Sequence, residues 1–189
     1  MAGITSGIGL LLSAARFAAL KHSDQRRKDA KASPYINHPI ALAETLWRVG
    51  KVKDPVVLAA ALLHDTIEDT QTTQEELRKA FGPAVAGIVA EVTDDKSLPK
   101  ARRKRLQVEH AAEASRRAKL VKLADKICNL EDILESPPAD WTVERKQEYF
   151  DWAKEVVDQV GAANAPLRRR FDRLYRKRPA ARTVSLAIA

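Results

Sequence analysis

The strongest constraint on the fold is the segment DPVVLAAALLHDTIED, residues 54–69. Asp54 followed by Pro55 is typical of a helix start, because aspartate caps the first turn and proline fits its first position. The apolar residues that follow point in every direction around a helix, so neighbouring helices must cover it on all sides. The segment therefore predicts one central, buried helix. Its last turns carry a histidine and three carboxylates, His64, Asp65, Glu68 and Asp69.

Helical patterns account for the rest of the chain, and no segment alternates as a strand would. Apolar spacing and stop signals predict further helices over about 8–24, 38–50, 74–81, 83–95, 101 onward, 115–134, 142–160 and 166–177. Thr73 and Glu76 form a capping-box pattern, and Gly82 follows as a stop. We therefore expect an all-α helical bundle. No repeat or linker divides it, so we predict one domain over 1–178 and a flexible tail over 179–189.

The composition indicates an ordinary globular protein. The 189 residues are 45% hydrophobic and 31% charged, which suits a single core. The lone Cys128 excludes an internal disulfide and fits a reducing compartment, so we predict a cytoplasmic location. No uncharged apolar run reaches the about 18 residues of a membrane span, which argues against a membrane partner. The net charge of +8 suits a polyanionic partner, whether nucleic acid, a membrane surface or a small phosphorylated metabolite, and does not choose among them.

Charged side chains at the end of the buried helix suggest a metal site. Successive helical residues diverge by about 100°, so His64 and Asp65 offer two ligands from adjacent faces. His38, at a predicted helix start, and Asp125, on an otherwise apolar helix face, are the candidates that complete the set. Two nitrogen and two oxygen ligands favour Mn²⁺, Fe²⁺ or Zn²⁺, and the carboxylates favour Mn²⁺ for phosphate chemistry. Coordination positions left open by these four would imply catalysis.

Each residue also has a simpler explanation. A buried histidine such as His38 is often only hydrogen-bonded within a core, and Asp125 has an ion pair with Lys122 or Lys126 as its alternative. Glu68 and Asp69 lie one turn after the predicted ligands, about 6 Å along the helix axis. That spacing suits a water or reacting group held beside the metal, whereas a helix end turning toward solvent is the alternative. A single metal site explains all of these residues together, whereas the simpler explanations require a separate cause for each.

Three ordered motifs carry a family resemblance: SPYINHPIALA (33–43), AALLHDTIEDT (60–70) and VKLADKICNL (121–130). They resemble the HD-domain hydrolases of the RelA/SpoT type, and the likeness extends from about Phe17 to Arg178. That span leaves no room for the synthetase and regulatory domains of the long members. The chain therefore resembles the small single-domain alarmone hydrolases named after the metazoan SpoT homologue. An HD-domain helical bundle is the fold that this resemblance implies.

The resemblance implies roles for individual residues. Its metal is one Mn²⁺ ion, bound by His38, His64, Asp65 and Asp125. The pair that orients and deprotonates the attacking water is Glu68 and Asp69. The residues that match nucleotide contacts are Arg27, Lys28, Tyr35, Lys100, Asn129, Arg145 and Tyr149.

Within the nucleotide set, Arg27 and Lys28 are expected to hold the nucleotide, with the guanidinium plane stacked on the base. Asn129 matches a ribose contact, and Arg145 with Tyr149 matches residues that close over phosphate and sugar. The implied reaction is hydrolysis of the 3′-diphosphate of guanosine tetra- or pentaphosphate, which releases pyrophosphate and GDP or GTP.

Two other functions are compatible with the same residues. One is a phosphohydrolase for another phosphorylated nucleotide such as NADPH, since the basic segments would bind any phosphorylated ribose. The other is a basic helical module that binds nucleic acid and has an inactive HD site. The basic run at 96–105 lacks interleaved aromatic residues for base stacking, and a binder has no need of Glu68 and Asp69 beside a metal. Nucleic acid is therefore the less favoured partner.

Overall fold

The computed structural model describes residues 7–180, and these residues form helices with no strand among them. The elements are α1 (Gly7–Lys21), α2 (Asn37–Arg48), α3 (Pro55–Leu63), α4 (Thr66–Asp69), α5 (Gln74–Phe81), α6 (Pro83–Val92), α7 (Lys100–Glu109), α8 (Arg116–Glu135), α9 (Val143–Val160), the 3₁₀ turn η1 (Gly161–Ala163) and α10 (Ala165–Tyr175). The all-α expectation is confirmed. Of the predicted tail, residues 181–189 lie outside the described residues, so the boundary at 178 stays a prediction.

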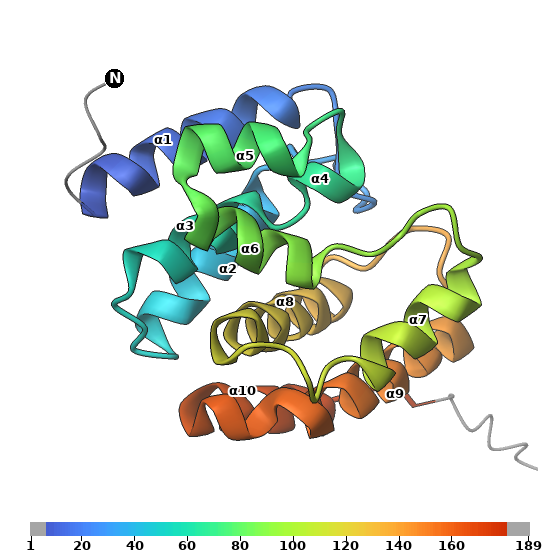
Figure 1. Cartoon of the computed structure of the whole chain (residues 1–189). Helices are drawn as coiled ribbons and strands as arrows, with labels where there is room; N and C mark the ends of the chain where they lie inside the picture. Colours follow the sequence, from blue (N-terminus) through green and yellow to red (C-terminus); the bar gives the residue numbers. More distant parts are fainter. Residues whose placement is uncertain (1–6, 181–189) are drawn as a thin grey trace, which may run out of the picture.

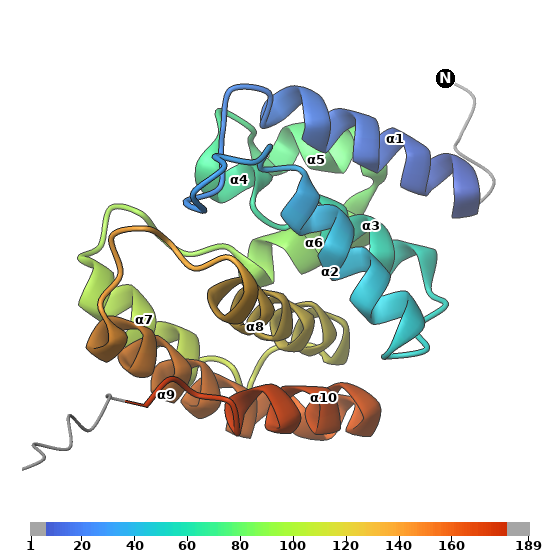
Figure 2. The ribbon, with the colours of Figure 1, turned by 180° about the vertical axis from the view of Figure 1, so that it is seen from behind.

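The helices surround α8, which runs through the middle of the molecule between the N-terminal helices and the pair α9 and α10 (Figures 1 and 2). One hydrophobic cluster extends from Ala14 in α1 to Leu174 in α10. Its large, fully buried side chains include Leu123 and Leu130 of α8 and Phe150 of α9. Burial of this shared core fixes the positions of the helices that carry the candidate site.

The apolar helix α3 is central, as predicted. It packs against α1, α2, α6 and α8. Residues 57–63 are all buried, which is the environment that an uninterrupted apolar surface requires. Its start is capped as expected, because the Asp54 carboxylate accepts a hydrogen bond from the Val56 backbone N–H at 2.9 Å.

The predicted helix boundaries around α5 are also present. The Thr73 hydroxyl accepts a hydrogen bond from the Glu76 backbone N–H at 3.1 Å. At the other end Gly82 has a φ of +86°, a conformation that side chains with a Cβ rarely adopt. Glycine therefore ends α5 and allows α6 to begin at Pro83.

The prediction of one continuous helix through residue 69 is wrong. Helix α3 ends at Leu63, and the short helix α4 begins at Thr66. Side chains bind the carbonyls of the last turn: the His64 ring lies 2.9 Å from the Ala61 oxygen, and the Thr66 hydroxyl donates to the Leu63 oxygen at 2.7 Å. Such side-chain bonds compete with the backbone hydrogen bonds of the helix. The helix is therefore interrupted at His64 and Asp65, where the candidate site residues begin.

Within residues 7–180, no helix has the length and apolar character needed to cross a membrane.

Candidate active site

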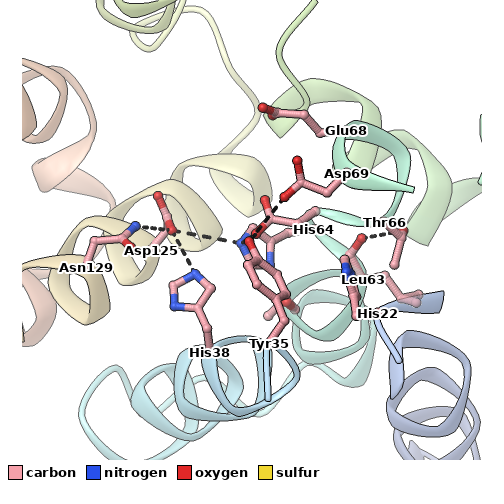
Figure 3. A network of polar contacts seen from close by, with 12 residues as sticks. His22, Tyr35, His38, Leu63, His64, Thr66, Glu68, Asp69, Asp125 and Asn129 are labelled. Carbon is pink, nitrogen blue, oxygen red and sulfur yellow. Dashed lines mark hydrogen bonds and ion pairs between the residues drawn. The ribbon is translucent and has the colours of Figure 1, made fainter. Parts of the chain in front are cut away.

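The four predicted metal ligands come from three elements, and Figure 3 shows three of them, His38, His64 and Asp125, close together. His38 is in the first turn of α2, His64 and Asp65 form the break between α3 and α4, and Asp125 is in the middle of α8. Ligand atoms of His38, His64 and Asp65 all lie within 4.8 Å of one another. Asp125 borders this group, because its Oδ1 is 3.2 Å from His38 Nε2 and 3.9 Å from His64 Nε2.

The orientation of His64 fits a metal ligand. Its Nδ1 lies 2.9 Å from the Ala61 carbonyl oxygen, which can only accept a hydrogen bond, so the neutral ring carries its proton on Nδ1. Nε2 is then left with a lone pair, and it lies 2.9 Å from Asp65 Oδ2. Nε2 is buried and has no aligned hydrogen-bond partner among the described residues. Metal-binding histidines typically donate their other ring N–H to a backbone carbonyl or a carboxylate, as Nδ1 of His64 does to Ala61.

The electrostatics of the cluster favour a cation. Burial lowers the pKa of His64, but the carboxylates of Asp65 and Asp125 outweigh it and raise the pKa to about 9. Burial raises the pKa of Asp65, whereas His64 and His38 pull it well below its usual range. The pKa of Asp125 is likewise well below its usual range, because Lys126 and both histidines outweigh the effect of burial. Both aspartates are therefore ionised and face the histidines.

The Tyr35 hydroxyl contacts the carboxylates of Asp65 and Asp69, and its ring also lines a cavity. Its hydroxyl donates to Asp65 Oδ2 and lies 3.3 Å from Asp69 Oδ2. Burial and the two nearby carboxylates hold its pKa above the usual range, so the phenol stays protonated and remains a donor. The sequence-based prediction gave Tyr35 a place in the nucleotide pocket, and its ring does line that cavity. Its hydroxyl links a candidate metal ligand to a candidate catalytic carboxylate.

Glu68 lies beyond the ligands, at the edge of a basic cavity. Its carboxylate accepts a hydrogen bond from the Asp94 backbone N–H at 3.1 Å and lies 3.4 Å from the Arg103 guanidinium. Burial and the neighbouring carboxylates raise its pKa to about 7 despite the hydrogen bond from Asp94. A carboxylate with a pKa near neutrality is suited to accept a proton in a reaction at neutral pH.

Asp69 is held at three points. Its carboxylate forms an ion pair with Lys96 and contacts the Tyr35 hydroxyl, while its backbone oxygen accepts a hydrogen bond from Gln25 at 2.5 Å. Gln25 is in turn 2.7 Å from Nδ1 of the buried His22. Figure 3 shows Glu68 and Asp69 together on α4, on the same side of the site. They follow Asp65 by three and four residues in the sequence. The predicted catalytic pair therefore adjoins the predicted ligands.

One cavity reaches the ligand cluster, and a second cavity adjoins the first. The first, of about 630 Å³, is lined by five of the predicted site residues with nucleotide roles, Arg27, Lys28, Tyr35, Asn129 and Tyr149. His38 and Asp69 are also part of its wall. This cavity is large enough for a nucleoside and reaches the candidate metal ligands directly.

The second cavity, of about 510 Å³, contains the other two predicted contacts, Lys100 and Arg145. Tyr149 and Trp141 line both cavities and form their shared wall. Arg103 and Lys104 add two further positive charges to the second cavity. The predicted nucleotide residues are thus divided between two adjoining cavities, both of which contain basic and aromatic side chains.

Several residues of the site were not predicted. Asp132 forms an ion pair with Arg27, and the Arg27 guanidinium lies 5.6 Å from the centre of the Tyr35 ring. Arg103 and Lys104 come from the run KARRKR, where charge alone did not distinguish inward from outward positions. The run lies on helix α7, which packs against α9. A helical reading of the run, with one face turned toward α9, could have predicted that Arg103 and Lys104 line the site.

Comparison with known proteins agrees with this fold. A family model described as "HD domain" matches residues 14–151, well over half of the chain. The chain therefore belongs to the HD-domain family.

Within that family the chain is similar to the proteins named guanosine-3′,5′-bis(diphosphate) 3′-pyrophosphohydrolase MESH1. The Xenopus tropicalis protein is 53% identical over 172 residues, which cover 91% of this chain and 96% of the relative. The Homo sapiens protein is 53% identical over 168 residues, covering 89% and 94%. A solved structure with 50% identity and a TM-score of 0.87 covers 89% of this chain and 95% of its own; it is described as a metazoan ortholog of SpoT that hydrolyzes ppGpp and plays a role in starvation responses.

Proposed function

We propose that this protein is a metal-dependent hydrolase that removes the 3′-diphosphate of guanosine tetra- or pentaphosphate as pyrophosphate. The observation that carries the proposal is a buried ligand cluster at the wall of a nucleoside-sized cavity, which shares Trp141 and Tyr149 with a basic cavity. The names of the nearly full-length relatives support the same substrate class. The single buried Cys128 supports a cytoplasmic location for this activity.

The residues present fit a divalent ion. His38, His64, Asp65 and Asp125 would hold it, since they offer two imidazole nitrogens and two ionised carboxylates within a small volume. Nitrogen and oxygen ligands without thiolate favour Mn²⁺, with Fe²⁺ and Zn²⁺ as alternatives. When bound, such an ion polarises a phosphoryl oxygen and makes a water molecule more acidic.

Glu68 and Asp69 would handle the water. Glu68 takes a proton from the attacking water, because its pKa of about 7 is suited to that task. Asp69, held by Lys96 and Tyr35, orients the water toward the phosphorus. The water oxygen forms a bond to the phosphorus of the 3′-phosphate while the bond to the ribose 3′-oxygen breaks. Pyrophosphate leaves, and a proton returns to the 3′-oxygen.

The two cavities would hold the substrate. Arg27 and Tyr35 offer a guanidinium plane and an aromatic ring to the base, and Asn129 faces the ribose from α8. Lys28 adds a positive charge at the same cavity. Across the shared Tyr149 wall, Lys100 and Arg145 offset the negative charge of phosphates, which is where phosphoryl transfer gains most from a protein.

A substrate comparison tests this proposal. The protein, stripped by a chelator and reloaded with Mn²⁺, Fe²⁺, Zn²⁺ or Mg²⁺ in turn, is assayed with guanosine tetraphosphate and with NADPH. We expect kcat/KM to be highest with Mn²⁺ and guanosine tetraphosphate. If kcat/KM were higher for NADPH, the proposed substrate would change from guanosine tetraphosphate to NADPH. A folded, metal-loaded protein that turns over neither substrate would contradict the proposal.

A further inference from the structure

Lys126 is a buried lysine beside the candidate metal ligand Asp125. Its exposed fraction is 5%, and it is the only lysine among the buried residues of the described chain. Its Nζ lies 2.9 Å from Asp125 Oδ2. On the other side, Nζ lies 4.3 Å from the centre of the Trp152 ring in α9. A buried ammonium is costly unless it is paired, so this position needs an explanation beyond packing.

The two oxygens of Asp125 have different surroundings. Oδ2 faces Lys126. Oδ1 accepts a hydrogen bond from the Asn129 side-chain amide at 2.6 Å and faces the histidines, 3.2 Å from His38 Nε2 and 3.9 Å from His64 Nε2. Lys126 therefore takes up one carboxylate oxygen and leaves the other toward the ligand cluster.

We propose that Lys126 is a positioning residue that reserves Asp125 Oδ1 for the metal and limits how tightly the metal is held. The inference rests on the proposed metal site and extends it to a residue with no contact to substrate. The ammonium occupies Oδ2, so Asp125 offers one oxygen rather than two. Fewer protein ligands leave room for water and substrate. Its positive charge also opposes that of a dication close by.

A merely structural lysine would behave differently on substitution. Loss of a structural partner disorders Asp125, so metal binding and turnover should weaken together. Loss of the positioning lysine leaves an uncompensated carboxylate, so a cation should bind more tightly while turnover falls. The sign of the change in metal affinity therefore separates the two roles.

The experiment measures Mn²⁺ binding to chelator-stripped protein by isothermal titration calorimetry, together with thermal unfolding and steady-state kinetics. Lys126→Met removes the charge and keeps an apolar stem. Lys119→Met is the matched control on α8, because Lys119 is only partly buried and its Nζ donates to the Ala112 backbone oxygen at 2.7 Å. Lys126→Arg keeps a positive donor beside Oδ2.

For Lys126→Met we expect the Kd for Mn²⁺ to fall about tenfold. We also expect kcat to fall about tenfold with a smaller change in KM. The midpoint of unfolding should drop in the stripped protein, and added Mn²⁺ should raise it more than in the wild type. Lys126→Arg should restore both the Kd and kcat toward wild-type values. Lys119→Met should change neither.

A folded Lys126→Met protein with an unchanged or higher Kd for Mn²⁺ would overturn the inference. Where that variant does not fold, Lys126→Gln, which also lacks the charge, gives the same test. Calorimetry needs no substrate, so a wild-type protein that binds Mn²⁺ but hydrolyses no alarmone would contradict the proposed function and still report on Lys126.

Discussion

The hydrogen bond between His64 and the Ala61 carbonyl decides which ring nitrogen faces the site. With a proton held on Nδ1 by that carbonyl, Nε2 is the nitrogen that faces Asp65 and Asp125. The sequence could place a histidine beside an aspartate, but it could not reveal the carbonyl that orients the ring. The Ala61 carbonyl lies in the last turn of α3, where carbonyls have no helical partner, so it is free to accept a hydrogen bond from the His64 ring.

At the residue scale, metal binding and water activation should be separable. We expect His64→Ala and Asp65→Ala to lose Mn²⁺ binding and turnover together, because each removes a ligand. Glu68→Gln should keep Mn²⁺ binding and lose about 100-fold in kcat, since proton transfer by a positioned side chain contributes on that order. Calorimetry and steady-state kinetics on the same preparations check both. Full activity of Glu68→Gln would rule out its role as the base.

The pH dependence should report Glu68. Its pKa is raised from 4.5 to about 7 by burial and neighbouring carboxylates, and a bound dication lowers it from that value. The base acts when it is deprotonated, so kcat/KM should decrease as pH falls through a pKa above 4.5 and no higher than about 7. This acid limb should be absent from the residual activity of Glu68→Gln. An identical limb in that variant would assign the titration to another group.

At the scale of elements, the break between α3 and α4 positions the catalytic pair. Thr66 is fully buried, and its hydroxyl donates to the Leu63 carbonyl at 2.7 Å. Thr66→Val leaves that carbonyl without its partner, so we expect the free energy of unfolding to fall by about 1–3 kcal/mol. We also expect kcat to fall, because α4 carries Glu68 and Asp69. Denaturant unfolding and kinetics measure the two effects.

Thr73→Ala is the control for this prediction. It removes the cap of α5, where the hydroxyl accepts from the Glu76 backbone N–H, at a cost of about 1 kcal/mol. Its turnover should stay at the wild-type level. A Thr66→Val protein that loses stability but keeps kcat would show that the break does not position the catalytic pair.

Helix starts and stops were predictable where one residue determines them. Asp54 with Pro55 marks the start of α3, and Gly82 marks the end of α5, since each satisfies a local backbone requirement. The break at His64 was not predictable from periodicity. Residues 56–69 contain no glycine or proline that would mark a break. The interruption depends on side-chain bonds to carbonyls that only the folded chain brings into reach.

At the scale of the whole molecule, the candidate ligands join α2, α8 and the α3–α4 break. An ion that binds the native state and not the unfolded chain stabilises the fold, by about 2.7 kcal/mol at a concentration 100 times its Kd. We therefore expect Mn²⁺ to raise the midpoint of thermal unfolding and a chelator to lower it. Asp65→Ala should unfold at the same temperature with or without Mn²⁺. A wild-type midpoint that does not respond to Mn²⁺ would contradict the assigned ligand set.

The sequence predicted which residues form the site, but not that their side chains line two separate cavities. His38 and Asp125 were predicted as partners of His64 because they interrupt apolar surroundings, and the fold brings all of them together. The separation into two cavities by Tyr149 depends on how α9 lies against α7 and α8. The pairing of Arg27 with Asp132 joins a loop to α8, a contact that no local pattern encodes.

The most direct measurement of the central claim is product release from guanosine tetraphosphate by chelator-stripped protein, with and without added Mn²⁺. We predict pyrophosphate and GDP in equal amounts when Mn²⁺ is present, and neither without it. The Asp65→Ala protein should release neither product under both conditions. Equal turnover with and without Mn²⁺, or phosphate released in place of pyrophosphate, would contradict a metal-dependent 3′-pyrophosphohydrolase.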